Sequence, residues 1–349
     1  MAAADLDGAA RPRRFHRFSL FAAATLLLLA AAMIGSLAIG TVAIPASEVW
    51  SILIHGIWPA EQSVSTAGRQ AIVWELRAPR TLVAAVVGAG LGLVGAAMQS
   101  ATRNPLSDPH LLGVSAGAAF GANLAILHVG DVLGPATTPL FAFAGALAAT
   151  LCVLSVARMA GAGTADRLVL TGVAVAFVVM ACANMQILFA DQRAAASVVF
   201  WTLGGLGASD WSTIAFPTGA LLIGGGWFVL KARDLNALAM GDETAATLGL
   251  SVERSRLVLL SVGAFVTGVM VAVSGMIGFV GLMTPHIARL ILGGDNRLVL
   301  PASALLGSLF LVVADIVART VIAPDEMPIG IVTGIVGGTF FVALLSRAK

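Results

Sequence analysis

The chain has 349 residues, 58% of them hydrophobic and only 11% charged, and its mean hydropathy is +0.96. An ordinary soluble domain carries about 25% charged residues. This composition therefore excludes an ordinary soluble domain and indicates a chain that crosses a membrane several times. The net charge of +2 is small, and no cluster of Lys and Arg is interleaved with aromatic residues, so we expect no nucleic-acid partner.

Ten apolar runs follow one another along the chain, separated by polar breaks. Runs of roughly 20 apolar residues are long enough to cross a hydrocarbon core as helices, and these lack the short alternating segments of a membrane β-barrel. We therefore predict an all-α polytopic membrane protein with about ten transmembrane helices, in which one domain over 19–349 follows an N-terminal tail over 1–18. The predicted spans are 19–40, 81–101, 111–128, 138–158, 168–190, 212–231, 256–275, 278–293, 298–320 and 329–347.

The distribution of Lys and Arg predicts the orientation of these spans. If the N-terminus is cytoplasmic, fifteen of the twenty Lys and Arg fall in cytoplasmic segments, which is the bias expected there. We therefore expect both termini in the cytoplasm. Tryptophan supports this orientation, because residues typical of a membrane interface gather on the outer side. These are Trp50, Trp58, Trp74, Trp201 and Trp211, and the outer arginines are Arg69, Arg77, Arg80, Arg193 and Arg319.

Short helices are also expected between the spans. The outer stretch 41–75 contains "SEVWSILIHGIW", whose apolar residues suit a helix lying in the membrane interface. A second short outer helix is expected near 197–206. The Gly-rich sequence "GAGLGLVGAA" in the second span favours tight packing between helices through small faces.

A polar segment, "GDETAATLGLSVERSR" at 241–256, interrupts the apolar sequence between the sixth and seventh spans. Gly241 and Gly249 bound a short helix, and Asp242 and Glu243 stand in its first turn, where acids suit the helix dipole. The predicted topology places this segment on the cytoplasmic side. A short polar helix in that position is suited to docking on another protein.

The chain has no convincing energy source of its own. A phosphate-binding loop needs Gly-x-x-x-x-Gly-Lys-Ser/Thr, but the only lysines are Lys231, which Ala follows, and Lys349, the last residue. Asp315 and Arg319 are the only clear charges within a span, and their spacing also suits a local ion pair. We therefore expect no enzymatic activity in this chain and energy supplied by another subunit.

Neither of the two cysteines indicates a covalent or metal site. Cys152 and Cys182 both fall inside predicted spans, where cysteine behaves as a small apolar residue. We expect no disulfide and no metal site.

Five ordered motifs resemble those of permeases of type II ABC importers, which bring haem, iron siderophores or cobalamin into bacteria. The resemblance runs from about residue 41 to the C-terminus. The motifs are "RAPR" at 77–80, "GAAMQSATRNPLSDPHLLGVSAGAAFGA" at 95–122, "GDETAATLGL" at 241–250, "GFVGLMTPHIAR" at 278–289 and "ADIVART…EMPIGIVTGIVGGTFF" at 314–341.

This resemblance implies a complete transport assembly in the bacterial inner membrane. Two copies of the permease surround a translocation path, two ATP-binding cassette subunits that hold ATP and Mg attach on the cytoplasmic side, and a periplasmic substrate-binding protein docks on the outer side. Likeness to the haem-importing branch favours haem as the cargo, with ferric siderophore or cobalamin as alternatives. No cofactor is expected on this chain itself. A carrier driven by an ion gradient is the rival class, with Asp315 as its candidate acid.

The resemblance also implies roles for individual residues. Arg77, Arg80 and Arg319 match positions that meet glutamates of the binding protein, although the first two also suit a snorkelling role. Coupling helices that contact the ATPase are expected at about 235–254. Their candidate contact residues are Gly241, Asp242, Glu243, Ala245, Leu248, Gly249 and Leu250.

The path through the membrane is less clearly marked. Met98, Gln99 and Asn123 are candidates for residues that face the translocation path, although Met in a Gly-rich span also suits packing. His286 is a conceivable haem ligand, but its position near the cytoplasmic end of a span favours a structural or exit-path role. We interpret His110 in the same way.

Overall fold

A computed structural model describes residues 2–57, 66–108, 110, 113–159 and 165–347. Helices account for most of these residues, and no strand occurs among them. The helices before residue 200 are α1 (Ala2–Ala38), α2 (Ala46–Ile57), α3 (Ala67–Ala71), η1 (Ile72–Arg77), α4 (Ala78–Thr102), α5 (Val114–Leu124), η3 (Ala125–Val129), η4 (Gly134–Ala136), α6 (Thr137–Met159), α7 (Ala165–Leu188) and α8 (Gln192–Thr202). They are followed by α9 (Ala215–Ala220), η5 (Leu221–Gly225), α10 (Gly226–Leu230), α11 (Ala232–Ala239), α12 (Asp242–Thr247), α13 (Val252–Ser274), α14 (Val280–Leu292), α15 (Asn296–Thr320) and α16 (Ile329–Arg347).

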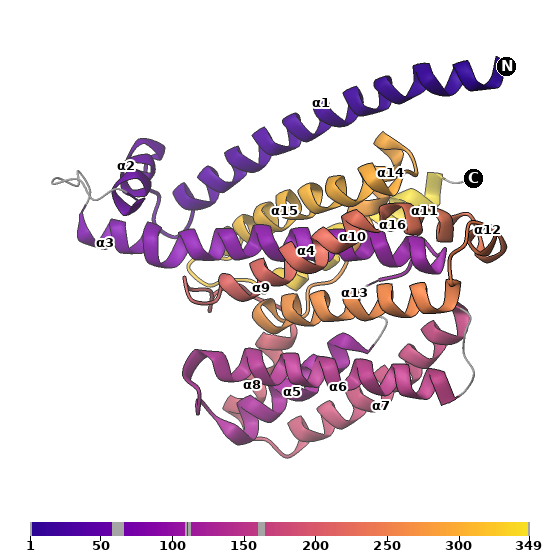
Figure 1. Ribbon diagram of the computed structural model, residues 1–349. Coiled ribbons are helices and arrows are strands. Elements are labelled where there is room, and N and C mark those ends of the chain that lie inside the picture. Colours follow the sequence, from indigo (N-terminus) through magenta and orange to yellow (C-terminus); the bar gives the residue numbers. More distant parts are fainter. Residues whose placement is uncertain (1, 58–65, 109, 111–112, 160–164, 348–349) are drawn as a thin grey trace.

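The long helices form a bundle built around α4. Helices α5 to α8 gather on one side of it, α13 lies between them and α4, and α14, α15 and α16 lie on the other side (Figure 1). The span that contains α4 is the most buried one, and α4 packs most extensively against α15. The N-terminal part of α1 diverges from this bundle (Figure 1).

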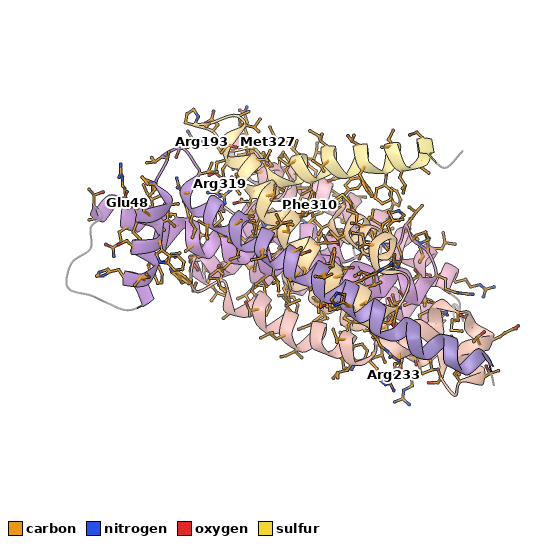
Figure 2. The ribbon with its side chains drawn as sticks, turned by 90° about the horizontal axis from the view of Figure 1, so that it is seen from above. Glu48, Arg193, Arg233, Phe310, Arg319 and Met327 are labelled. Atoms are coloured by element: carbon orange, nitrogen blue, oxygen red, sulfur yellow. The ribbon has the colours of Figure 1, made fainter. Side chains whose placement is uncertain are left out.

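The bundle has two distinct ends. The first residues of α1, the last turns of α16 and the short helices α11 and α12 lie at one end, which we call the α12 end (Figure 1). Helices α2 and α3 lie at the opposite end, which we call the α2 end (Figure 1). Seen from above, Glu48 and Arg319 lie toward the α2 end and Arg233 toward the α12 end, with the apolar Phe310 between them (Figure 2). Both termini therefore lie at the same end, as an even number of spans requires.

The helices agree with the predicted spans one by one. Within the described residues, seven helices are long and apolar enough to cross a membrane. The helices Ala215–Leu230 and Ala232–Ala239, which meet at 58°, satisfy the same criteria when they are taken together. Two shorter apolar helices are Val114–Val129 and Val280–Leu292. The predicted all-α polytopic fold is confirmed.

The predicted N-terminal tail is not separated from the first span by a break. Helix α1 runs without interruption from Ala2 to Ala38, and its apolar part begins at His16. The sequence before residue 16 is rich in Ala and Arg, which are strong helix formers. The helix therefore continues beyond the length that crosses a membrane.

Glycines bring helix backbones into direct contact. A Cβ atom at Gly88 of α4 would lie 2.2 Å from the carbonyl oxygen of Gly307 of α15, and one at Gly307 would lie 2.1 Å from that of Gly88. The pair Gly117 and Gly145 joins α5 to α6 in the same way, at 2.3 and 2.1 Å. Contacts this close leave no room for any side chain, which is the use of small residues between membrane helices. The packing expected from the Gly-rich second span is confirmed.

The short helix expected in 41–75 is α2. Val49 and Ile52 are buried against the bundle, while Trp50 and Ile54 are exposed, so apolar side chains point both to the protein and away from it. Trp58, which was predicted on the outer side, lies outside the described residues. The second short outer helix, α8, begins and ends earlier than expected, because the side chain of Asp191 caps its first turn.

Candidate functional site

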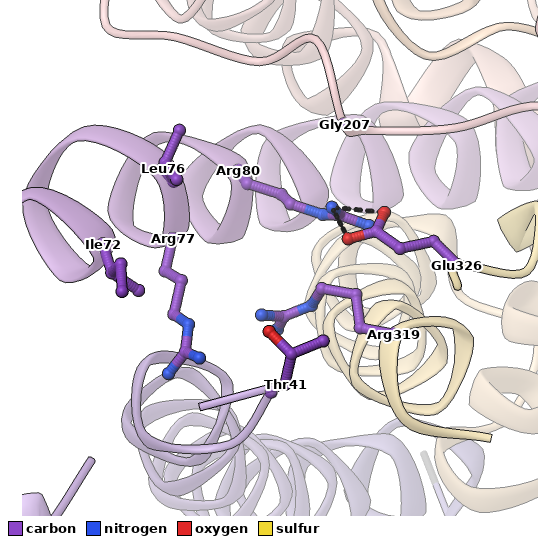
Figure 3. A pocket seen from close by; sticks show the side chains of 9 residues that line it. Thr41, Ile72, Leu76, Arg77, Arg80, Gly207, Arg319 and Glu326 are labelled. Atoms are coloured by element: carbon purple, nitrogen blue, oxygen red, sulfur yellow. Dashed lines mark hydrogen bonds and ion pairs between the residues drawn. The ribbon is translucent and has the colours of Figure 1, made fainter. Parts of the chain in front are cut away.

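Three of the arginines that the sequence predicts on the outer side share one cavity at the α2 end. Arg77 and Arg80 lie where η1 passes into α4, three residues apart and so on one helix face. Arg319 lies in the last turn of α15, and Glu326 stands in the loop that follows it. The four side chains line a cavity of about 280 Å³ (Figure 3).

Arg80 is held between two carboxylates in this cavity. Its Nε donates to Asp315 Oδ1 at 2.9 Å. Its Nη1 donates to the two carboxylate oxygens of Glu326 at 3.0 and 2.8 Å (Figure 3). Arg319 Nε lies 3.0 Å from Asp315 Oδ2, so the local ion pair expected from the spacing is confirmed. Asp315 is fully buried, and its single carboxylate is the counter-ion of two guanidinium groups, those of Arg80 and Arg319.

Arg77 and Arg319 also hold the end of α1. Arg77 donates to the carbonyl oxygens of Leu37 at 2.7 Å and Val42 at 2.6 Å. Arg319 Nη2 donates to the hydroxyl oxygen of Ser36 at 2.7 Å. The last carbonyls of a helix lack partners within it, so the two arginines supply donors there. Arg77 is only 6% exposed and Arg319 only 5%. Arg77 therefore makes a buried structural contact and does not snorkel.

The cavity carries more positive than negative charge. Three guanidinium groups face two carboxylates, and the described polar contacts of Arg77 are with backbone carbonyls. Glu326, with 48% of its side chain exposed, is the more accessible of the two acids. This excess of positive charge favours carboxylates that approach from outside.

At the other end, α12 begins and ends at the predicted glycines. Gly241 has φ of +120° and Gly249 has φ of +85°, conformations that favour glycine. The amide of Leu250 donates to the Ala245 carbonyl at 3.1 Å, and that of Gly249 donates to the Ala246 carbonyl at 2.9 Å. These two bonds form a Schellman motif, which ends the helix after six residues.

The predicted coupling residues divide between the surface of α12 and its attachment to the bundle. Glu243 and Leu248 are exposed, and Leu248 is 64% exposed although it is apolar. Met240, just before α12, is 68% exposed and extends this apolar surface. Ala245 is fully buried, and Asp242 contacts the bundle instead of facing only outward. The segment 235–254 thus includes the end of α11, all of α12 and the first turn of α13.

Two arginines, Arg256 and Arg103, favour the ionised form of Asp242. The hydrogen bond from Arg256 lowers the pKa of Asp242, burial opposes this shift in part, and Arg103 adds to the lowering. An ordinary Asp has a pKa of about 3.9. The stabilisation from this contact is therefore fully present above that pH and is lost as the pH falls through the lowered value.

We predict that the opening of α12 does not depend on pH between about 8 and 5 and increases below about pH 4. Both groups that face Asp242 are arginines, which remain protonated throughout. Amide hydrogen exchange of α12, corrected for the intrinsic pH dependence of exchange, measures this directly. A rise in opening between pH 7 and 6 would contradict the assignment.

The three candidate path residues lie between helices inside the subunit. Met98, Gln99 and Asn123 are 2%, 3% and 2% exposed. Gln99 Nε2 donates to the Gly281 carbonyl at 3.1 Å, and its Oε1 accepts a hydrogen bond from Arg289. Asn123 donates to the Ala183 carbonyl at 2.9 Å. In this arrangement they join helices and do not reach the subunit surface.

Both candidate histidines also contact other helices. The ring of His110 bonds to the hydroxyl of Ser115, and its Nε2 lies 3.0 Å from the Ile277 carbonyl oxygen. It therefore links the start of α5 to the turn before α14. The ring of His286 packs against Phe340 and Phe341 of α16, at centroid distances of 6.0 and 6.4 Å.

Two residues of these sites were not singled out from the sequence. Glu326 lies between two prolines, Pro324 and Pro328, and belongs to the motif at 314–341, but no role was assigned to it. Arg256 was counted among cytoplasmic positive charges, yet it is fully buried. The only sequence feature that marks Arg256 is a charged residue at the start of a span. An exposed arginine has the same feature, so the sequence does not show that Arg256 is buried.

Comparison with known proteins assigns this helical bundle to the permease class of ABC transporters. The chain belongs to the FecCD transport family, which matches residues 27–347. It is 35% identical over 348 residues to the hemin transport system permease protein HmuU of Yersinia pestis, covering 99% of this chain and 98% of that one. It is 39% identical over 304 residues to the vitamin B12 import system permease protein BtuC of Serratia proteamaculans, covering 87% and 88% of the two chains.

A solved structure shows the same fold. A metal-chelate type ABC transporter in an inward-facing conformation is 28% identical, with a TM-score of 0.78 over 93% of this chain and 98% of that one. The chain is therefore a multi-pass membrane permease subunit of an ABC importer.

Proposed function

We propose that this permease moves haem, or a related iron chelate, from the periplasm to the cytoplasm across the bacterial inner membrane. The observation that carries this proposal is the likeness to the hemin permease over almost the whole of both chains. Cobalamin is the second candidate cargo, because the identity to the vitamin B12 permease is 39%, although over less of the chain. A ferric siderophore remains the third.

The proposed assembly contains two copies of this chain, two ATP-binding cassette subunits and a periplasmic binding protein. The α12 end faces the cytoplasm, in agreement with the excess of Lys and Arg predicted there. The cassette subunits bind ATP and Mg and contact the exposed surface of α12. Closure of these subunits displaces α12, and the bundle then changes between outward and inward opening.

The structure weakens the rival class of ion-coupled carrier. Its candidate acid, Asp315, is already bound by Arg80 and Arg319. An acid that takes up and releases a coupling ion should be free of such permanent counter-charges.

The cavity with Arg77, Arg80 and Arg319 is the proposed docking place for acidic side chains of the binding protein. Because two of these arginines are buried and support α1, reversing their charge would disturb the fold as well as docking. Glu326 offers a cleaner test, because it is exposed and competes for Arg80 with any incoming carboxylate.

Glu326→Gln should tighten docking of the binding protein by roughly two- to fivefold, mainly through faster association at low salt. Glu75→Gln is the matched control, because it removes the same charge from another exposed position near the α2 end. Surface plasmon resonance over a salt series separates the two rates. Equal effects of the two variants, or weaker docking of Glu326→Gln, would remove the cavity from the docking surface.

Leu248→Asp should reduce co-purification of the ATPase subunit by about tenfold or more, because a charge replaces an apolar contact at the proposed interface. Leu248 is exposed in the isolated chain, so the thermal stability of the purified permease should not change. Full retention of the ATPase would show that α12 does not form the contact.

Uptake into proteoliposomes tests the proposed function. The complete complex, with its ATPase and its binding protein, is supplied with haem, a ferric siderophore or cobalamin, each with and without internal ATP. We expect ATP-dependent accumulation of haem. Accumulation of cobalamin or the siderophore alone would assign the cargo to the corresponding alternative.

A further inference from the structure

The buried guanidinium of Arg256 joins three helices at the α12 end. Arg256 lies near the start of α13 and is 0% exposed. Its Nε donates to the carbonyl oxygen of Ala101 in the last turn of α4 at 3.0 Å. Its Nη2 donates to Asp242 Oδ1, at the start of α12, at 2.7 Å. One side chain of α13 thus contacts both α4 and α12.

A second arginine brings α4 to the same carboxylate. Arg103 ends α4 in the left-handed conformation, with φ of +54°, which is uncommon for a residue other than glycine. Its Nη2 lies 3.4 Å from Asp242 Oδ1. The carboxylate of Asp242 is therefore contacted from the ends of two long helices.

Helix α11, which precedes α12, is attached at a separate place. Asn236 donates to Asp295 Oδ1 at 2.7 Å and accepts from the amide of Asn296 at 2.8 Å. The Asn296 side chain accepts in turn from Ser100 of α4 at 2.9 Å. The short helices are thus fastened to α15 through α11 and to α4 and α13 through α12.

We propose that Asp242 is a positioning residue that fixes α12 to α4 and α13, so that a displacement of α12 moves these two spans. This assignment rests on the proposed coupling role of α12. It differs from the role expected for Asp242 from the sequence, which was direct contact with the ATPase.

The chemistry of the contact suits a mechanical link. The planar guanidinium presents several donors in a fixed fork, so Arg256 bonds the Ala101 carbonyl and the Asp242 carboxylate together. Because Arg256 is buried, loss of its carboxylate leaves a charge without its counter-ion, which opposes separation of α12 from the bundle. A lysine has a single charged nitrogen and does not reproduce this geometry.

Asp242→Asn keeps the shape of the side chain and removes its charge. In the full complex we expect ATPase co-purification and ATP hydrolysis within about twofold of wild type, but a fall of about tenfold in cargo transported per ATP hydrolysed. Asp242→Glu, which retains the charge, should restore part of this ratio. Asp234→Asn is the matched control, because it removes a carboxylate of α11 from the exposed i,i+3 pair with Lys231, the residue before this helix.

Hydrogen exchange on the permease alone provides a second measurement that does not depend on the assembly. Asp242→Asn should raise exchange in α12 while the middle of α4 remains protected, and Asp234→Asn should leave α12 unchanged. An unchanged transport ratio or unchanged α12 exchange would overturn the proposal. Loss of the ATPase with normal α12 exchange would overturn it too, because Asp242 would then be a direct contact. Absence of ATP-dependent uptake by the wild-type complex would instead refute the proposed function.

Discussion

Asp315→Ala should lower the free energy of unfolding by about 3–5 kcal/mol, the cost of removing one partner from a buried ion pair. Asp315 is fully buried and lies between Arg80 and Arg319, with N–O distances of 2.9 and 3.0 Å. Without it, two guanidinium groups approach each other with less counter-charge. Unfolding of the purified permease in mixed micelles, followed by circular dichroism, measures this loss.

Glu326→Ala is the control for this prediction. Glu326 also binds Arg80, but about half of its side chain is exposed, so its loss should cost no more than about 1 kcal/mol. If both variants lowered the free energy of unfolding by the same small amount, Asp315 would not be the main counter-ion of Arg80 and Arg319.

Gly88→Ala should destabilise the permease by about 3 kcal/mol, because one added methyl group meets backbone that cannot move aside. The new Cβ would lie 2.2 Å from the Gly307 carbonyl oxygen, in the most extensive helix contact of the bundle. The same unfolding assay and the yield of folded protein measure this effect.

Gly219→Ala is the matched control, because Gly219 lies in α9 and a Cβ there meets no atom within 4 Å. That variant should be neutral or more stable by about 0.4–1 kcal/mol, since alanine restricts the unfolded chain. Equal behaviour of the two variants would contradict the close contact between α4 and α15.

The spans were predictable because each depends on local composition. A helix satisfies all its backbone hydrogen bonds within one segment, so a run of about 20 apolar residues can cross lipid as a helix whatever its neighbours are. The ends of α12 were predictable for a similar reason, since Gly241 and Gly249 mark a left-handed backbone in their own positions. In contrast, the start of α8 was missed although Asp191 gives a local capping signal.

The side-chain contacts of the arginines were not predictable from local sequence. Arg77 and Arg319 bond the end of α1, which is more than 30 residues from the first and more than 270 from the second. Arg256 could have been an exposed cytoplasmic charge, because its burial depends on how α4, α12 and α13 meet. The same holds for the candidate path residues Met98, Gln99 and Asn123. Their Gly-rich sequence does not distinguish a side chain packed between helices from one that faces a path.

Some of the arginines and predicted coupling residues lie at the surface and others lie inside the bundle. This distinction refines the transport hypothesis. At the α2 end, the accessible group is Glu326, and the arginines behind it also maintain the fold. At the α12 end, Leu248 and Met240 provide the exposed surface, and Asp242 provides the attachment. Each end thus combines a surface suited to a partner with a buried contact that leads into the long helices.

The most direct test of the central claim is the energy source for transport by the reconstituted complex. Cargo accumulation is measured with internal ATP in the presence of ionophores, and with an imposed ion gradient in the absence of ATP. We expect accumulation with ATP that ionophores do not affect, and none with the gradient alone. Accumulation that requires the gradient and not ATP would contradict the assignment of this chain as the permease of an ATP-driven importer.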